Sequence, residues 1–162
     1  MTVKIPMKLH STLILCAVAA LAGCSQQTEA TDKLVQAQSR VGIAATAYPN
    51  TAVVNTDFVV SVSVVNAGQV TLPSLGKNKT DLNKVGISYH WRQMDEKVAV
   101  WDGAFTPLKS DIKKGDTQAL DLSIKAPPAP GTYVLEIDAL QTGAFWFAGA
   151  GSQTARINVT VK

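Results

Sequence analysis

Cysteine and histidine are scarce in this chain, with only two of each among its 162 residues. Both cysteines lie within the first 24 residues, and His90 is the one histidine that follows them. A hydrolytic serine needs a histidine base that a carboxylate orients, and no Gly-x-Ser-x-Gly elbow is present. Structural zinc needs four Cys or His ligands. The sequence therefore predicts a protein that is not an enzyme and holds neither a metal nor another cofactor.

An excess of charge of one sign is also missing. The chain has 15 Lys and Arg residues against 12 Asp and Glu residues, which gives a formal net charge of +3. The basic residues form no stripe along any segment, so the sequence does not predict a nucleic-acid partner.

Long hydrophobic runs are absent as well. The apolar stretch Leu13–Ala22 has about ten residues, whereas a membrane-spanning helix needs ~20. Lys4 and Lys8 precede this stretch, and Leu21-Ala22-Gly23-Cys24 ends it. Together these features resemble the signal peptide and lipobox of bacterial lipoproteins.

The lipobox resemblance implies that a peptidase removes residues 1–23 and that the thiol of Cys24 carries acyl chains such as palmitate. Several acyl chains hold a protein at a membrane almost permanently. In lipoproteins an aspartate after the cysteine tends to retain the protein in the inner membrane, so Ser25 implies outer-membrane sorting. We therefore expect an outer-membrane anchor, on the periplasmic face rather than the cell surface. Either Met1 or Met7 could be the start of the chain.

Residues 24–40 are predicted to form a flexible tether behind the lipid. The segment is polar, lacks aromatic residues and shows little sustained apolar periodicity. A short helix across Asp32–Ser39 is compatible with this composition.

Residues 41–162 alternate apolar and polar side chains between turn residues, which is typical of β-strands. No long helical pattern separates these segments, which argues against parallel βαβ units. About seven strands are expected, in an antiparallel β-sandwich of immunoglobulin-like type, and residues 70–84 are expected to be a loop. The period-two pattern runs from Val41 onward, and strands are expected near residues 58–65, 85–92, 98–101, 120–125, 133–138 and 155–161.

The alternation also assigns side chains to the two faces of each strand. In the strand near 85–92 the expected inward residues are Val85, Ile87, Tyr89 and Trp91. The expected outward residues there are Ser88, His90 and Arg92, and in the strand near 133–138 they are Glu136 and Asp138. Trp91 is therefore expected in the core. The outward residues are expected to be solvated, with His90 either solvated or a strand-pairing residue. Arg92 and Asp138 could pair with each other or with a ligand hydroxyl.

Phe145, Trp146 and Phe147 are three consecutive aromatic residues with small residues on both sides. Successive side chains of a strand alternate between faces, so the three cannot all face one core. At least one is expected on the other face, where it could stack on a sugar or anchor a protein partner. A bulged strand that buries two of the three is the alternative. Trp101, at the end of a predicted strand, could be either buried or exposed.

Several short motifs, taken in order, resemble a bacterial immunoglobulin-like module. They include Tyr89-His90-Trp91, Trp101-Asp102-Gly103, Pro130-Gly131-Thr132-Tyr133 and Trp146-Phe147. Such modules accompany glycosyltransferases and polysaccharide-export proteins, and the likeness extends loosely to the carbohydrate-binding C-terminal domain of ATPases that export O antigen. The likeness covers about Val53–Lys162, and it implies a sandwich fold and a glycan partner.

The sequence therefore predicts a lipid-anchored, non-enzymatic envelope module that binds a glycan or assists polysaccharide assembly. The candidate ligand-binding residues are Trp146, Phe145, Phe147, Trp101, His90, Arg92 and Asp138. A protein-interaction or scaffold lipoprotein of an envelope complex is the alternative, because an edge strand can accept a partner's strand without special residues. A proteinase inhibitor of immunoglobulin-like fold is a third interpretation, with the loops near Pro73 and Phe145 as its wedge.

Overall fold

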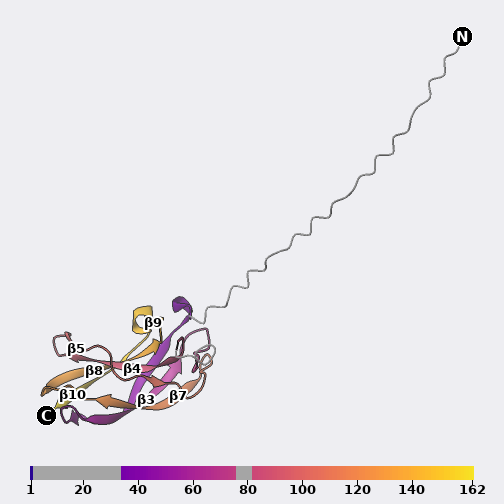
Figure 1. Cartoon of the computed structure of the whole chain (residues 1–162). Coiled ribbons are helices and arrows are strands. Elements are labelled where there is room, and N and C mark those ends of the chain that lie inside the picture. The colour runs from indigo at the N-terminus through magenta and orange to yellow at the C-terminus, as the bar shows by residue number, and fades with distance from the viewer. Residues whose placement is uncertain (2–33, 76–81) are drawn as a thin grey trace. The chain divides into compact units, whose positions relative to one another are not determined.

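The computed structural model describes Met1, residues 34–75 and residues 82–162 (Figure 1). The predicted signal peptide, the lipobox with Cys24 and most of the expected tether lie outside the described residues. In the described ranges, no helical segment has the length and hydropathy of a membrane span.

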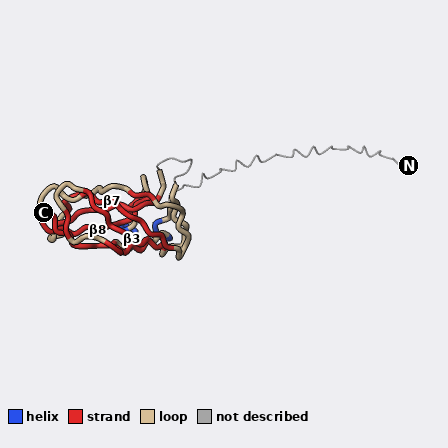
Figure 2. The backbone as a smooth tube through the Cα atoms, turned by 90° about the horizontal axis from the view of Figure 1, so that it is seen from below, coloured by secondary structure: helices blue, strands red, loops and turns tan. Residues whose placement is uncertain are grey.

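Strands account for about half of the described chain, and they dominate its regular structure, as Figure 2 shows. Two 3-10 helices accompany them, η1 (Gln36–Gln38) and η3 (Ala148–Ala150). The η1 helix falls within the segment where a short helix was expected. The strands are β1 (Val41–Ala47), β2 (Thr51–Ala52), β3 (Asp57–Asn66), β4 (Val85–Gln93), β5 (Val98–Val100), β6 (Thr106–Pro107), β7 (Thr117–Lys125), β8 (Gly131–Gln141), β9 (Phe145–Trp146) and β10 (Ala155–Val161).

The strands form two sheets. The small sheet has the order β1-β3-β7, and the large sheet has the order β2-β10-β8-β4-β5, with β6 also paired to β4 and β9 to β8. Apolar inner faces of the two sheets share one core, so the predicted all-β, immunoglobulin-like sandwich is confirmed. The chain passes from the small sheet to the large sheet between β1 and β2.

Two details of the strand prediction were wrong. The described chain has more strands than the expected seven, because β2, β6 and β9 each contain two residues. Two residues are too few to show an alternation. The sandwich is also not entirely antiparallel, since β2 runs parallel to β10 with Thr51 opposite Thr160.

The inner face of β4 forms the centre of the core, as its alternation predicts. Trp91 is 0% exposed, and its indole Nε1 donates a hydrogen bond of 2.9 Å to the carbonyl oxygen of Lys125. Its ring packs against Phe58 from β3 and Tyr133 from β8, with centroids 6.2 and 6.0 Å away. The predicted core position of Trp91 is confirmed.

The outer face of the large sheet is covered rather than solvated. His90 and Asp138, from β4 and β8, are 3% and 2% exposed, and Ser88 and Glu136 beside them are also buried. The prediction that this face is solvated was therefore wrong. The physical reason is that two segments lie against this face and shield it from water. They are residues 101–105, which follow β5, and residues 142–154, which follow β8.

Candidate functional site

Three aromatic side chains meet on the outer face of the large sheet, and we call them the aromatic shelf. They are His90 from β4, Trp101 directly after β5 and Trp146 from β9. The ring of His90 stacks on Trp101 at 4.1 Å between centroids and an interplanar angle of 18°. Trp146 packs against both rings, 4.4 Å from His90 and 6.1 Å from Trp101. Trp101 remains 46% exposed, so the shelf presents an open aromatic surface.

Local chain geometry brings Trp101 to His90. The hairpin after β4 turns at Glu96, whose φ of 68° lies in the left-handed region. The turn returns β5 along β4 with Val100 opposite Trp91. Trp101 follows immediately, and so it reaches the outward side chain of His90.

The aromatic triplet divides between the two faces of the large sheet. Trp146 pairs with Leu140 of β8 and lies on the outer face, where it is half-buried. Phe147 is 0% exposed in the core, and Phe145 packs against the core with its ring 4.9 Å from Phe147. Of the three candidates, Trp146 is therefore the one on the shelf.

The hydrogen bonding of His90 fixes which ring nitrogen carries the proton. Its Nδ1 lies within hydrogen-bond distance of the carbonyl oxygen of Trp101. A carbonyl only accepts, so Nδ1 carries the proton and donates it, which leaves Nε2 as an acceptor in the neutral ring. The ring is 3% exposed, because Trp101 and Trp146 pack against it.

A network of charged side chains borders the shelf. Arg92 forms an ion pair through Nε with Glu136, and its guanidinium carbon lies 5.9 Å from the centroid of the Trp101 ring. Arg156 of β10 lies 3.5 Å from Glu136, and its Nη2 contacts both carboxylate oxygens of Glu96 at 2.6 and 2.7 Å. Hydrogen bonding from Arg156 lowers the pKa of Glu96. The network thus joins the β4–β5 hairpin to β8 and β10.

Asp138 lies beneath the shelf and ties its covering segment to β8. Its carboxylate accepts hydrogen bonds from the backbone N–H of Ala139 at 2.7 Å and from that of Ala148 at 3.1 Å to each oxygen. Burial raises the pKa of this carboxyl from 3.8 to about 6, against the lowering effect of the two N–H groups, and the charge of Glu136 raises it further. Because Ala148 follows Trp146 by two residues, Asp138 holds the segment that carries the shelf tryptophan.

Five of the sequence candidates meet in one place: His90, Trp101, Trp146, Arg92 and Asp138. Arg92 pairs with Glu136 rather than with Asp138. Sequence reasoning missed Glu136, Arg156 and Glu96. The outward position of Glu136 was recognised, but its partners come from strands whose register the sequence does not show.

The two loops of the inhibitor interpretation are held close to the domain. Leu72, beside Pro73, is 0% exposed and exchanges two backbone hydrogen bonds of 3.0 Å with Ile112. Phe145 packs against the core. Leu75 in the first loop is 71% exposed, and the inhibitor interpretation stays a prediction.

A cavity of about 320 Å³ lies at the edge of the large sheet, on the other side of the segment that carries Trp101. Tyr89, Gly103 and Pro127 are among its lining residues. In the part of the chain that the structure describes, no three His, Cys, Asp or Glu side chains gather in a group that could hold a metal ion.

No family model and no curated protein sequence matches this chain. Among solved structures, it is similar to a CARDB domain from Pyrococcus furiosus, at 15% identity and a TM-score of 0.42, over 76% of this chain and 94% of that domain. A crystal structure of that domain in complex with di-metal ions gives 14% identity and a TM-score of 0.43, over 76% and 87%. A β-glucosidase from Listeria innocua in complex with glucose gives 12% identity and a TM-score of 0.45, over 76% of this chain but 16% of the enzyme. The likeness concerns the sandwich fold alone, and in the glucosidase only a small part of the enzyme.

Proposed function

We propose that this chain is a lipid-anchored, non-enzymatic module of the bacterial cell envelope that binds a glycan on the aromatic shelf. The anchor rests on the lipobox resemblance, with Cys24 as the acylated residue at the periplasmic face of the outer membrane. The glycan rests on one observation, the Trp101 ring that is 46% exposed while stacked flat on His90.

The chemistry of a sugar ring fits this arrangement. A pyranose has an apolar face of C–H groups and a rim of hydroxyls, so it needs a flat apolar partner and nearby hydrogen-bonding groups. Trp101 supplies the flat surface, which is already held by His90 and therefore loses little freedom on binding. Arg92 lies next to the Trp101 ring, and its N–H groups can donate hydrogen bonds to sugar hydroxyls.

The charges at the shelf favour a neutral or weakly charged glycan. Arg92 and Arg156 both pair with Glu136, and Arg156 also pairs with Glu96. A strongly anionic polymer would have to compete with these carboxylates for both guanidinium groups. A neutral sugar can instead use the remaining N–H groups without breaking an ion pair.

The test is a titration of residues 24–162, carrying Cys24→Ser, with surface polysaccharide fractions from the source bacterium. Intrinsic tryptophan fluorescence and calorimetry report binding. We expect saturable binding that Trp101→Ala weakens by about tenfold, because loss of a central stacking contact corresponds to roughly 1–2 kcal/mol. Trp146→Ala should also weaken binding while the domain still unfolds cooperatively.

Val98→Ala is the matched control, since Val98 is 47% exposed on the neighbouring strand β5 but contributes no aromatic ring. It should bind like the unaltered chain. A flat titration at millimolar sugar, with intact folding, would contradict the glycan proposal and favour the scaffold alternative. Crosslinking in the envelope would then identify the protein partner.

A further inference from the structure

One end of the sandwich collects the residues where the chain enters the described domain. The backbone N–H of Leu34 donates to Gln141 Oε1 at 3.0 Å, at the end of β8, and the N–H of Gln69 donates to the carbonyl oxygen of Gln38 at 2.7 Å. The register places Val85 opposite Gln141 and Val65 opposite Thr117 at this same end. We call it the entry end and define it as residues 34–42, 65–75, 82–86, 107–117 and 140–153.

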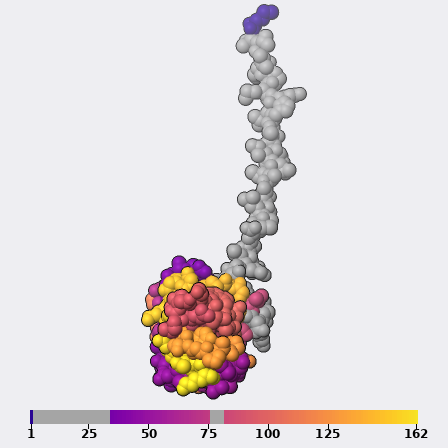
Figure 3. All heavy atoms as spheres, turned by 90° about the vertical axis from the view of Figure 1, so that its left-hand side faces the viewer, coloured from indigo at the N-terminus to yellow at the C-terminus, as the bar shows by residue number. Residues whose placement is uncertain are grey.

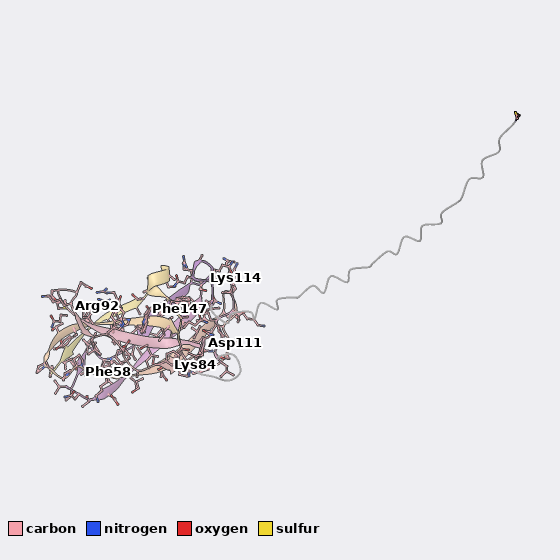
Figure 4. All side chains as sticks on the ribbon, turned by 45° about the horizontal axis from the view of Figure 1, so that its top comes forward. Phe58, Lys84, Arg92, Asp111, Lys114 and Phe147 are labelled. Carbon is pink, nitrogen blue, oxygen red and sulfur yellow. The ribbon has the colours of Figure 1, made fainter. Side chains whose placement is uncertain are left out.

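The entry end is positively charged. Among the described residues it carries five cationic side chains and two carboxylates, Asp111 and Asp116. Figure 4 shows Lys84, Asp111 and Lys114 together at this end, away from Arg92 and Phe58. Three exposed lysines lie in the turn before β7, namely Lys109, Lys113 and Lys114.

The hydrogen bonds of these lysines leave their charge unneutralised. Lys114 Nζ donates to the amide oxygen of Gln69 at 2.6 Å, and Lys109 Nζ donates to the carbonyl oxygen of Ala119 at 2.9 Å. Both acceptors are neutral. Asp111 accepts hydrogen bonds from the backbone and the hydroxyl of Ser74, each at 2.8 Å. The lysines therefore remain available to an anionic surface.

Exposed apolar side chains accompany the positive charge. Val35, Leu75 and Leu82 are 57%, 71% and 61% exposed, and all three belong to the entry end. Lysines interleaved with exposed aliphatic side chains are the composition that peripheral proteins place against a lipid headgroup layer.

The opposite end of the domain has balanced charge. The β4–β5 hairpin, the corner between β7 and β8 and the C-terminus gather there, as Figure 3 shows. In residues 48–58, 92–104, 123–135 and 158–162, four basic side chains stand against four acidic ones. The charge of the described domain is therefore polarised towards the entry end.

We propose that the entry end docks on an anionic lipid bilayer. This inference rests on the proposed lipid anchor at Cys24, because the chain from Cys24 to Leu34 reaches roughly 35 Å at full extension. A domain held within that distance meets the bilayer at high effective concentration, which adds to the attraction that the lysines exert on their own.

The test separates docking from the anchor. Residues 24–162 with Cys24→Ser, which cannot be acylated, are sedimented with vesicles of phosphatidylcholine containing phosphatidylglycerol or of phosphatidylcholine alone. We expect binding to the anionic vesicles only, which weakens as salt is raised. The Lys109→Glu/Lys113→Glu/Lys114→Glu variant should bind these vesicles with an affinity lower by at least about tenfold.

The matched control is Lys97→Glu/Lys125→Glu/Lys162→Glu, which changes the net charge equally at the opposite end. It should stay within about threefold of the parent chain. Equal losses in both variants, or no binding of the parent chain to anionic vesicles, would overturn the docking proposal. The anchor is read separately by comparing membrane pelleting of the full chain with and without Cys24→Ser. Equal pelleting of the two full chains would refute the lipid anchor. That outcome would leave the vesicle test of docking unaffected.

Discussion

The buried carboxyl of Asp138 should make the stability of this domain fall as the pH rises. In the folded chain its pKa is raised to about 6 from 3.8, chiefly by burial. Between these two values the folded state binds more protons than the unfolded state, so the free energy of unfolding decreases as pH increases. The difference corresponds to ~3 kcal/mol, since each pKa unit is about 1.4 kcal/mol. The contribution of Asp138 is therefore greatest below pH 4 and is lost above pH 6.

Asp138→Asn removes the titration while keeping a side-chain oxygen for the N–H of Ala148. The assay is urea unfolding of both proteins from pH 4 to pH 8, followed by tryptophan fluorescence. The stability of the parent chain relative to the variant should fall by about 2 kcal/mol across this range, because part of the ~3 kcal/mol is already lost at pH 4. Asp95 and Glu96, whose pKa values are lowered by Lys97 and Arg156, occur in both proteins and cancel in the difference. A stability difference that stays constant from pH 4 to pH 8 would refute the reasoning.

Two further substitutions test the packing. Trp91→Ala should lower the free energy of unfolding by about 3–5 kcal/mol, because it removes a fully buried indole and leaves the Lys125 carbonyl without its donor. A melting temperature equal to that of the parent chain would contradict this. Gly86→Ala should cost roughly 1–3 kcal/mol, since a Cβ there would lie 2.5 Å from the backbone oxygen of Thr106. Gly149→Ala is its control, with no atom within 4 Å of the added Cβ, and should leave the denaturation midpoint unchanged.

The core-facing side chains of the sandwich could be predicted because the alternation of apolar and polar residues is visible within each strand. Each long strand has one face in the core, so alternation along a few residues is enough to place Val85, Ile87 and Trp91 inward. The boundaries also follow from local features. β3 spans Asp57–Asn66, one residue beyond the expected strand at either end, because turn residues limit it on both sides.

The outer face of the large sheet could not be predicted in the same way. Ser88, His90 and Glu136 occupy outward positions, and alternation alone gives such residues to solvent. Their burial depends on Trp101, which follows the β4–β5 hairpin, and on Trp146, which comes from a segment remote in sequence. The candidate residues could be named one by one from their types. Their assembly into one site depends on strand register, in which His90 lies opposite Glu136, and no local pattern encodes that register.

The covered face explains how a small sandwich can hold an aromatic surface in a fixed position. An exposed tryptophan on a free loop would lose conformational entropy on binding, which weakens affinity. Here Trp101 is fixed by its stack on His90 and by the carbonyl contact to Nδ1, and the Trp146 segment is fixed by the bonds from Ala148 to Asp138. The buried polar groups of β4 and β8 thus contribute less as ligand contacts than as supports for the two tryptophans. Substitution of these supports should therefore affect binding through the order of the shelf, even where the altered side chain never touches the ligand.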